Sequence, residues 1–410
     1  MGRSEEEKAD GFFVRNKSAI VMGLAALIIA ATADLIAGLF LTSMEDYLLT
    51  ITGMMILIYC AIGMRGNIFG SMGSRLGTSM HMGTFKMTFK KNSVLRSNIE
   101  AALALTLSLS IAMGVAGWVV TEVFFGPTID LFRYVFISLV GGLLAGIIVV
   151  IFNVIIAHVG FKRDWDVDNI TAPLIAAAGD IATVPMIFIA TLAQDAIKED
   201  WIIYAVCIVL TIVTVYVMVK ILTRKNRRRK RMNEAKRILI QSTPVLLVCM
   251  LFEIVAGVVI QTETNNLVQY GVLLVLLPAF LNEGNALSGM LTSRLSSMLH
   301  LGTLAPKAVP QKAAVENFML IYLLAAVTFL LIGSAAYGVQ PDTLTYAVVI
   351  AIVMIAGMLT TTVINVLSYY VAIAAIKFRL DPDDHCIPVT SSVMDVIGTV
   401  ILVAVIGFML

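Results

Sequence analysis

Charged residues are scarce in this chain. Asp, Glu, Lys and Arg make up 14% of its 410 residues, whereas apolar residues make up 59%. A soluble globular chain carries about 25% charged residues. So little charge does not cover the outside of a water-soluble body, and the mean hydropathy of +0.93 agrees. The composition therefore excludes a soluble globular protein and predicts one whose outer surface faces lipid.

Histidine and cysteine are also few, with four of each. The cysteines show no paired spacing, and three of them lie within apolar runs, where free thiols fill space. His81 and His300 stand at the ends of apolar runs, and His158 stands alone. This pattern excludes a transition-metal site built from His and Cys. The net charge of +2 is no sign of a nucleic acid partner, because the basic residues sit in short loops between apolar runs, and we expect no such partner.

Long apolar runs dominate what is present. A helix needs about 20 apolar residues to cross the hydrocarbon of a bilayer. Eleven runs meet this need: 18–42, 46–64, 97–125, 130–160, 170–194, 201–222, 238–261, 267–281, 316–338, 343–376 and 386–410. We therefore predict an all-α polytopic membrane protein with eleven transmembrane helices. The first run lacks a small-residue cleavage site, so we expect a retained span rather than a signal peptide.

The second and eighth runs look short. Each is followed by a segment rich in Gly and Ser, 68–83 and 286–302, that continues it after a predicted break. A Gly-Asn pair stands at each break, Gly66-Asn67 and Gly284-Asn285. Glycine permits a turn that frees backbone carbonyls, and Asn adds an amide oxygen. Both features are typical of a water-filled path through a membrane.

Basic residues alternate between successive loops. One group of loops holds Lys86, Lys90, Lys91, Arg96, Lys162, Arg163, Lys307, Lys312, Lys377, Arg379 and the run 224–237. The other group, 43–46, 126–130, 195–200, 262–266 and 339–342, holds the single basic residue Lys198. Cytoplasmic loops carry the excess of Lys and Arg. We therefore expect a multi-pass plasma-membrane protein with a cytoplasmic N-terminus and Leu410 outside.

The sequence repeats itself. Residues 74–84 read SRLGTSMHMGT and residues 293–303 read SRLSSMLHLGT, at an offset of 219. At the same offset, Asp34-Leu-Ile-Ala-Gly matches Glu253-Ile-Val-Ala-Gly. An aspartate also stands seven residues beyond a proline near the end of each half, as Asp180 and Asp395.

These matches divide the chain into four parts. Residues 1–16 form a short cytoplasmic N-terminus, 17–194 a first five-helix repeat, 195–235 a linking helix with a basic loop, and 236–410 a second repeat. Since five is odd, the linking helix is needed to give both repeats the same orientation. We therefore expect a pseudo-two-fold axis along the membrane normal, with a pathway between the repeats.

Four carboxylates lie inside the predicted spans: Asp34, Asp180, Glu253 and Asp395. Each costs about 2.5–3.5 kcal/mol at the centre of a membrane helix. No Lys or Arg is found at comparable depth, so we expect a bound cation to neutralise them. The alternative is a protonated acid bonded to a neighbouring helix. At a rise of about 1.5 Å per residue, Asp180 and Asp395 lie about 16 Å deep, near the midplane.

Oxygen ligands surround these acids in the sequence: Asn67, Asn285, Thr183, Ser391, Thr171 and Thr390. A set of oxygen ligands favours Mg²⁺ or Ca²⁺ over Zn²⁺ or Cu⁺. Mg²⁺ dehydrates reluctantly, so it is expected to pass largely hydrated.

Several polar residues near the inner ends have two readings. Arg75 and Arg294 either snorkel or cap a helix, or they take part in gating. His81 and His300 are interfacial residues or pH sensors. The carboxylates Asp164, Asp166, Asp168, Asp381, Asp383 and Asp384 are solvated loop charges or concentrate cations at the cytoplasmic mouth. The basic run 224–231 is a topology anchor or binds lipid headgroups or nucleic acid.

The Gly-Asn, Ser-Arg-Leu and His-x-Gly-Thr blocks, with the closing aspartate, resemble the MgtE-type magnesium transporter domain. The tandem form with a linking span is similar to the eukaryotic magnesium solute carriers, which contain two such domains. The resemblance covers nearly the whole chain and implies a pore between two five-helix units. It implies that Asp180 and Asp395 bind magnesium and that Gly66, Asn67, Gly284 and Asn285 are the family's Gly-Asn elements.

The sequence thus predicts a divalent cation transporter, most consistent with Mg²⁺, and no enzyme. A channel and a Na⁺- or H⁺-coupled exchanger both stay open; Asp34 and Glu253 offer a second ion's site. The competing class is an intramembrane aspartyl enzyme, whose two acids share a proton in contact. The flanking glycine turns expected for such an enzyme are missing. One chain can suffice, and a homodimer stays open.

Overall fold

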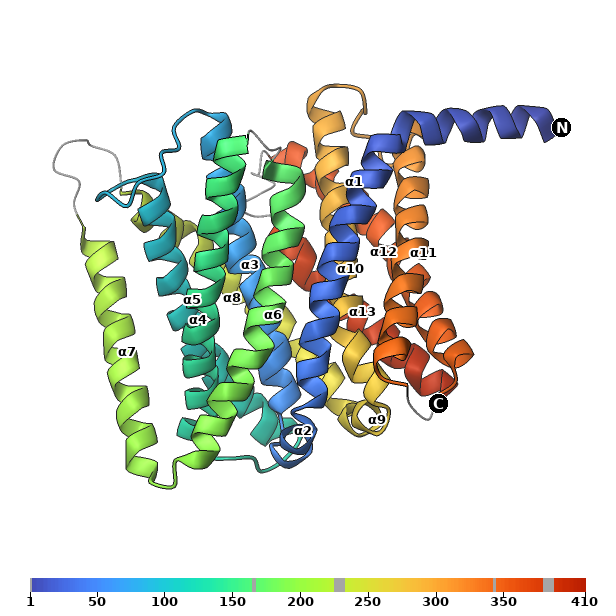
Figure 1. The fold of residues 1–410 in the computed structure, drawn as a ribbon. Coiled ribbons are helices and arrows are strands. Elements are labelled where there is room, and N and C mark those ends of the chain that lie inside the picture. Colours follow the sequence, from blue (N-terminus) through green and yellow to red (C-terminus); the bar gives the residue numbers. More distant parts are fainter. Residues whose placement is uncertain (1, 164–166, 225–232, 342–343, 379–386) are drawn as a thin grey trace.

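The computed structural model describes residues 2–163, 167–224, 233–341, 344–378 and 387–410. These residues form a bundle of helices (Figure 1). The helices are α1 Gly2–Thr42, α2 Glu45–Thr50, α3 Met54–His81, α4 Val94–Phe124, α5 Leu131–Arg163, α6 Val167–Ala196, α7 Asp200–Thr223, α8 Glu234–Thr262, α9 Thr264–Gln269, α10 Gly271–His300, α11 Lys312–Val339, α12 Tyr346–Phe378 and α13 Ile387–Met409. Eleven of them are long and apolar enough to cross a membrane. The predicted class and number of spans are confirmed.

The predicted breaks in the second and eighth spans are wrong. α3 and α10 run without interruption through Gly66-Asn67 and Gly284-Asn285. A glycine costs a helix interior only about 0.5–1 kcal/mol, whereas backbone groups freed within a membrane cost several kcal/mol each. The smaller cost of keeping the glycine in the helix explains why both helices continue. The turn instead precedes each long helix, where the short α2 and α9 lie and where Gly53 takes a left-handed φ of 84°.

The loops gather at two ends of the bundle (Figure 1). The basic loops 82–93 and 301–311 lie at the same end as the N-terminus, and α2, α9 and the C-terminus lie at the opposite end. This is the alternation that the distribution of Lys and Arg predicts. Which end faces the cytoplasm stays an expectation from that distribution.

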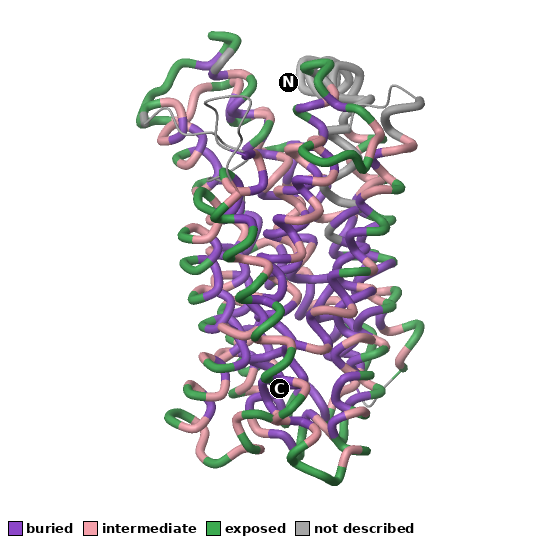
Figure 2. The backbone as a smooth tube through the Cα atoms, turned by 90° about the vertical axis from the view of Figure 1, so that its left-hand side faces the viewer, coloured by how far each residue is buried: buried purple, intermediate pink, exposed green. Residues whose placement is uncertain are grey.

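Burial separates the central helices from the linking helix. Figure 2 shows buried residues through the middle of the bundle and exposed residues along its margins and ends. Within their apolar windows, 72% of the residues are buried in α3 and 78% in α10, against 17% in α7. α7 stands at the edge of the bundle and packs on α4 and α5 (Figure 1). It therefore presents most of its surface to lipid.

The first helix of each half of the chain packs against both halves. We call α1 and α3–α6 the first helix set, and α8 and α10–α13 the second helix set. α1 packs on α6 of its own set and on α10 and α11 of the second set. α8 packs on α13 of its own set and on α3 and α4 of the first set. The interface between the sets is thus built around α1 and α8.

Two glycines bring these helices close together. A Cβ at Gly38 of α1 would overlap the backbone of Val275 in α10. A Cβ at Gly257 of α8 would lie 2.8 Å from the Cα of Ile56 in α3. Small residues permit such close approach of membrane helices. Each glycine stands four residues after an acid of the repeated motif, so the crossing draws that acid into the interface.

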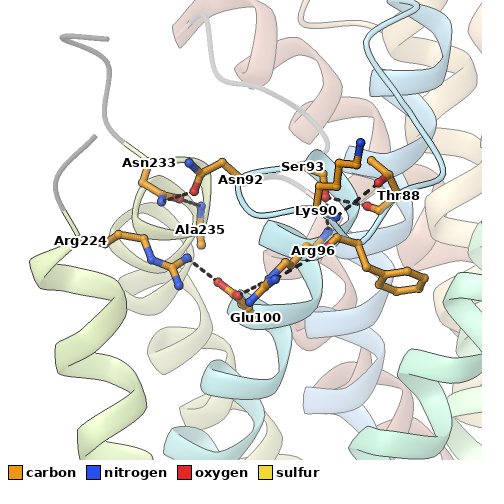
Figure 3. A network of polar contacts seen from close by, with 10 residues as sticks. Thr88, Lys90, Asn92, Ser93, Arg96, Glu100, Arg224, Asn233 and Ala235 are labelled. Carbon is orange, nitrogen blue, oxygen red and sulfur yellow. Dashed lines mark hydrogen bonds and ion pairs between the residues drawn. The ribbon is translucent and has the colours of Figure 1, made fainter. Parts of the chain in front are cut away.

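A polar network fixes the linking helix at the basic end (Figure 3). Glu100 of α4 accepts hydrogen bonds from Arg96 at 2.8 Å and from Arg224 at 2.6 Å. The amide of Asn233 donates to the side-chain oxygen of Asn92 at 3.3 Å. The end of α7 is thereby tied to α4, and the start of α8 is tied to the loop just before α4.

Candidate cation site

The first helix set buries one pair of acids. Asp34 of α1 and Asp180 of α6 are 1% and 3% exposed. Their carboxyl groups lie close enough to interact with each other. The contact follows from the packing of α1 on α6, which faces the first helix of the set toward its last.

The second helix set buries an equivalent pair. Glu253 of α8 and Asp395 of α13 are 2% and 7% exposed, and their carboxyl groups are also in contact. Asp180 and Asp395 lie near enough to interact electrostatically, so the two pairs adjoin. Four ionised carboxylates so close together repel one another in a medium of low dielectric. They need protons or a cation to neutralise them.

The acids come together in twos rather than in a closed cage. Among the residues that the structure describes, no three His, Cys, Asp or Glu side chains are close enough to hold a metal ion. A hydrated ion, bound through its water shell, needs fewer direct contacts.

Amide and hydroxyl donors surround the acids. Asn282 donates to Asp34 at 2.7 Å, and Asn285 donates to Asp395 at 2.8 Å. Ser392 donates to Glu253 at 2.7 Å. Asn67 donates to Ser392 at 2.9 Å and more distantly to Glu253 at 3.4 Å. These are the side chains that orient the carboxylates.

Sequence reasoning found Asn67 and Asn285 but missed two members of this shell. Asn282 stands three residues before Asn285, and Ser392 three residues before Asp395. Residues three apart share a helix face. Searching one turn on either side of each predicted ligand would have found both.

The remaining predicted site residues lie around the acids with different contacts. Thr183 directs its hydroxyl to the carbonyl of Gly179 on its own helix, at 2.6 Å. Ser392, the neighbour of Ser391, is the serine that bonds Glu253. A Cβ at Gly66 would meet open space, and one at Gly284 would touch Thr360 at 3.7 Å.

A small cavity adjoins Asn67. It has a volume of about 10 Å³, and α3, α4, α8 and α13 contribute its walls. Asn67, Ser71 and Arg75 line it along α3. This volume is about the least that holds one water molecule. The cavity places polar groups along α3 between the acids and the basic end of the bundle.

Two further ionisable residues lie at the depth of the Gly-Asn pairs. Arg65 of α3 is 1% exposed and Glu283 of α10 is 2% exposed. The prediction that no basic residue shares the depth of the acids is therefore wrong. It failed because the second and eighth spans were expected to end at residues 64 and 281, just before these side chains.

The inner arginines tie helices together. Arg75 donates to Asn98 and Arg294 donates to Asn317, each from Nε at 2.8 Å. Both contacts link helices of a single set, α3 to α4 and α10 to α11. The side chains of His81, His300, Asp164, Asp166, Asp168, Asp381, Asp383 and Asp384, and the run 225–232, lie outside the described part of the chain.

Comparison with known proteins identifies a family. The family model for MgtE, described as a divalent cation transporter, matches residues 58–190 and again residues 277–405. The two matches fall one in each helix set and together cover more than half of the chain.

Two curated relatives are solute carrier family 41 member 3 proteins. The mouse protein is 23% identical over 85% of this chain and 74% of its own length. The rat protein is 21% identical over 92% of this chain and 84% of its own length. A solved eukaryotic MATE transporter superposes with a TM-score of 0.37 at 11% identity over 97% of this chain and 96% of its own, too low to argue a shared fold. On the strength of the twofold family match, this membrane protein belongs to the MgtE family of divalent cation transporters.

Proposed function

We propose that this chain carries Mg²⁺ across the membrane along a pathway between its two helix sets. The observation that carries the proposal is the meeting of the two buried carboxyl pairs, Asp34 with Asp180 and Glu253 with Asp395. One divalent cation neutralises two carboxylates, and two adjoining pairs offer it ligands from both sets. The relatives named as solute carriers support the same class of function.

In this proposal Asp180 and Asp395 hold the ion and its water shell. Asn67 and Asn285 orient the acids and offer amide oxygens, with Asn282 and Ser392 in support. Oxygen ligands suit a hard cation, and Mg²⁺ keeps several waters when few carboxylates bind it. Gly66 faces open space, which leaves room for that water shell.

The two helix sets act as parallel repeats about a pseudo-two-fold axis. Three equivalences support this view: the acids four residues before Gly38 and Gly257, the packing of α1 and α8 on helices of both sets, and the matched bonds of Arg75 and Arg294. One chain then supplies both walls of the pathway. The basic loops orient the N-terminus toward the cytoplasm and Leu410 outward in the plasma membrane.

The test is magnesium flux into proteoliposomes that contain the purified chain and a Mg²⁺-sensitive dye. The double variant Asp180→Asn, Asp395→Asn should lower flux at least about tenfold, because the loss of both charges near a divalent ion costs more than about 1.4 kcal/mol. Folding is checked by the melting temperature of the variant. A matched control is Asp130→Asn in the 126–130 loop, away from the acids, which should leave flux unchanged. Normal flux in the folded double variant would refute the site.

A Na⁺- or H⁺-coupled exchanger is the second candidate. It is favoured by the excess of acids, because four carboxylates exceed what one divalent ion neutralises. Flux measured with and without a Na⁺ or a pH gradient separates the two mechanisms. The flux through a coupled exchanger increases when a gradient of its coupling ion, Na⁺ or H⁺, is applied. The flux through a channel responds only to the Mg²⁺ gradient and the membrane voltage.

A further inference from the structure

Arg65 is a fully buried arginine in the middle of α3. It is 1% exposed, and its Nε, Nη1 and Nη2 atoms have no hydrogen-bond partner among the residues that the structure describes. A guanidinium offers five N–H donors and does not lose its proton in proteins. Such a charge at the centre of a membrane costs at least about 2.5–3.5 kcal/mol. A buried acid escapes this cost by taking up a proton, but an arginine needs a negative partner.

Glu253, the acid of the cation site that approaches α3, does not supply that partner. Glu253 approaches α3 at Gly63 and Asn67. Both stand two residues from Arg65, and two residues turn a helix by about 200°. Arg65 therefore points away from Glu253, into the interior of the first helix set.

There its guanidinium meets the crossing of α4 and α5. A Cβ at Gly142 of α5 would lie 2.8 Å from Nη2 of Arg65 and would overlap the hydroxyl of Ser110 in α4. The glycine thus leaves the arginine and the serine facing the same point. The Oγ of Ser110 is itself buried and has no hydrogen-bond partner within the described ranges. One turn earlier on α4, the Oγ1 of Thr106 lies beside Gly146 and is likewise buried without a partner in the described part of the chain.

All of these groups can donate hydrogen bonds, and they surround the fixed positive charge of Arg65. Water would satisfy their hydrogen bonds but would leave the charge uncompensated. We infer that Arg65 and Ser110 bind a small monovalent anion of the halide class, because the missing side chain at Gly142 lets both groups approach the same point, and Thr106 offers a further hydroxyl. The site is separate from the cation pathway and does not rest on the proposed transport function.

The described residues of the second helix set form no such site. The Gly-Asn pairs place Glu283 at the position of Arg65, and the matched Arg–Asn bonds place Phe329 at the position of Ser110. A Cβ at Gly357 would overlap the ring of Phe329, just as one at Gly142 would overlap Ser110. Phe329 packs on Phe280 with ring centroids 5.1 Å apart. An aromatic contact therefore fills the place that donors line in the first set.

Thermal unfolding of the purified full chain tests the site. Sodium chloride replaces sodium gluconate at constant ionic strength while intrinsic fluorescence follows the melting temperature. A ligand that binds only the folded state raises this temperature, here by about 2 °C at saturation. Bromide should act like chloride.

Three variants decide the outcome. Arg65→Gln should abolish the chloride-dependent shift. Ser110→Ala, which keeps the charge, should raise the half-saturating chloride concentration about tenfold, as expected for one lost hydrogen bond to a charged group. Arg294→Gln, an arginine bonded to Asn317 in the other set, should keep the full shift.

Equal melting temperatures of the wild-type chain in chloride and gluconate would overturn the inference, and would mean that water alone fills the site. A full shift in Arg65→Gln would overturn it as well, because the anion would then bind elsewhere. Should Arg65→Gln not be recovered folded, an unchanged chloride response in Ser110→Ala would count against the site.

Discussion

The pair formed by Glu253 and Asp395 is held by neutral donors from Asn67, Asn285 and Ser392. The pair formed by Asp34 and Asp180 receives one such bond in the described part of the structure, from Asn282. Hydrogen bonds to a carboxylate share out its negative charge. The second pair is thus partly balanced by the protein itself, whereas the first pair leaves more charge for a cation to balance. Two pairs from one repeated sequence therefore have unequal hydrogen-bond surroundings.

Substituting one acid of each pair tests whether the two pairs contribute equally to Mg²⁺ flux. Asp180→Asn should lower Mg²⁺ flux by at least about tenfold, since Asp180 touches Asp34 and also faces Asp395. Asp395→Asn should lower it less, by about threefold, because Asn285 and Ser392 remain to orient the other groups. Proteoliposome flux of the two variants at equal protein content measures the ratio. Equal losses would show that the pairs act alike.

A second, intermediate effect concerns stability. Gly38→Ala should lower the free energy of unfolding by about 1–3 kcal/mol, because its methyl group would overlap the Val275 backbone in α10. Gly257→Ala should cost less, since its closest approach is 2.8 Å, to the Cα of Ile56. Unfolding of the purified chain in mixed detergent measures both. A larger loss for Gly257→Ala would contradict the packing described for α1 and α8.

The smallest effect separates packing from transport. Gly66→Ala meets open space and Gly284→Ala meets only Thr360 at 3.7 Å, so neither should destabilise the chain. Alanine in a helix should instead stabilise each by about 0.5–1 kcal/mol. If Gly66 leaves room for a hydrated ion, its methyl group should also lower flux severalfold, and Gly284→Ala is the matched comparison. Unaltered flux in Gly66→Ala would remove this glycine from the pathway while leaving the acids in place.

The sequence predicted much of the fold because the length of each apolar run and the uneven distribution of Lys and Arg between the loops are properties of the sequence itself. The eleven spans follow from apolar runs, and the four membrane acids follow from their cost. It failed at Arg65 and Glu283 for a physical reason. Polar residues next to Gly-Asn pairs lowered the local hydropathy, which suggested helix ends where α3 and α10 in fact continue.

The candidate site was only half predictable for a different reason. A residue's own type shows that it is expensive in lipid, so Asp34, Asp180, Glu253 and Asp395 stand out. Its partner depends on how neighbouring helices are rotated and how closely they cross. Nothing along the chain says that Asn282 bonds Asp34 or that Ser392, rather than Ser391, bonds Glu253.

The class of the protein, its number of spans, the repeated motifs and the four energetically costly acids could therefore all be predicted from the sequence. These are local properties, set by transfer of each side chain from water to lipid. Other features became visible only in the folded structure. α1 and α8 each pack on helices of both sets, and the acids lie together as two unequal pairs. Arg65 faces Ser110 beside Gly142. Those outcomes depend on close packing between distant segments, where the absence of one methyl group at a glycine sets which side chains can meet.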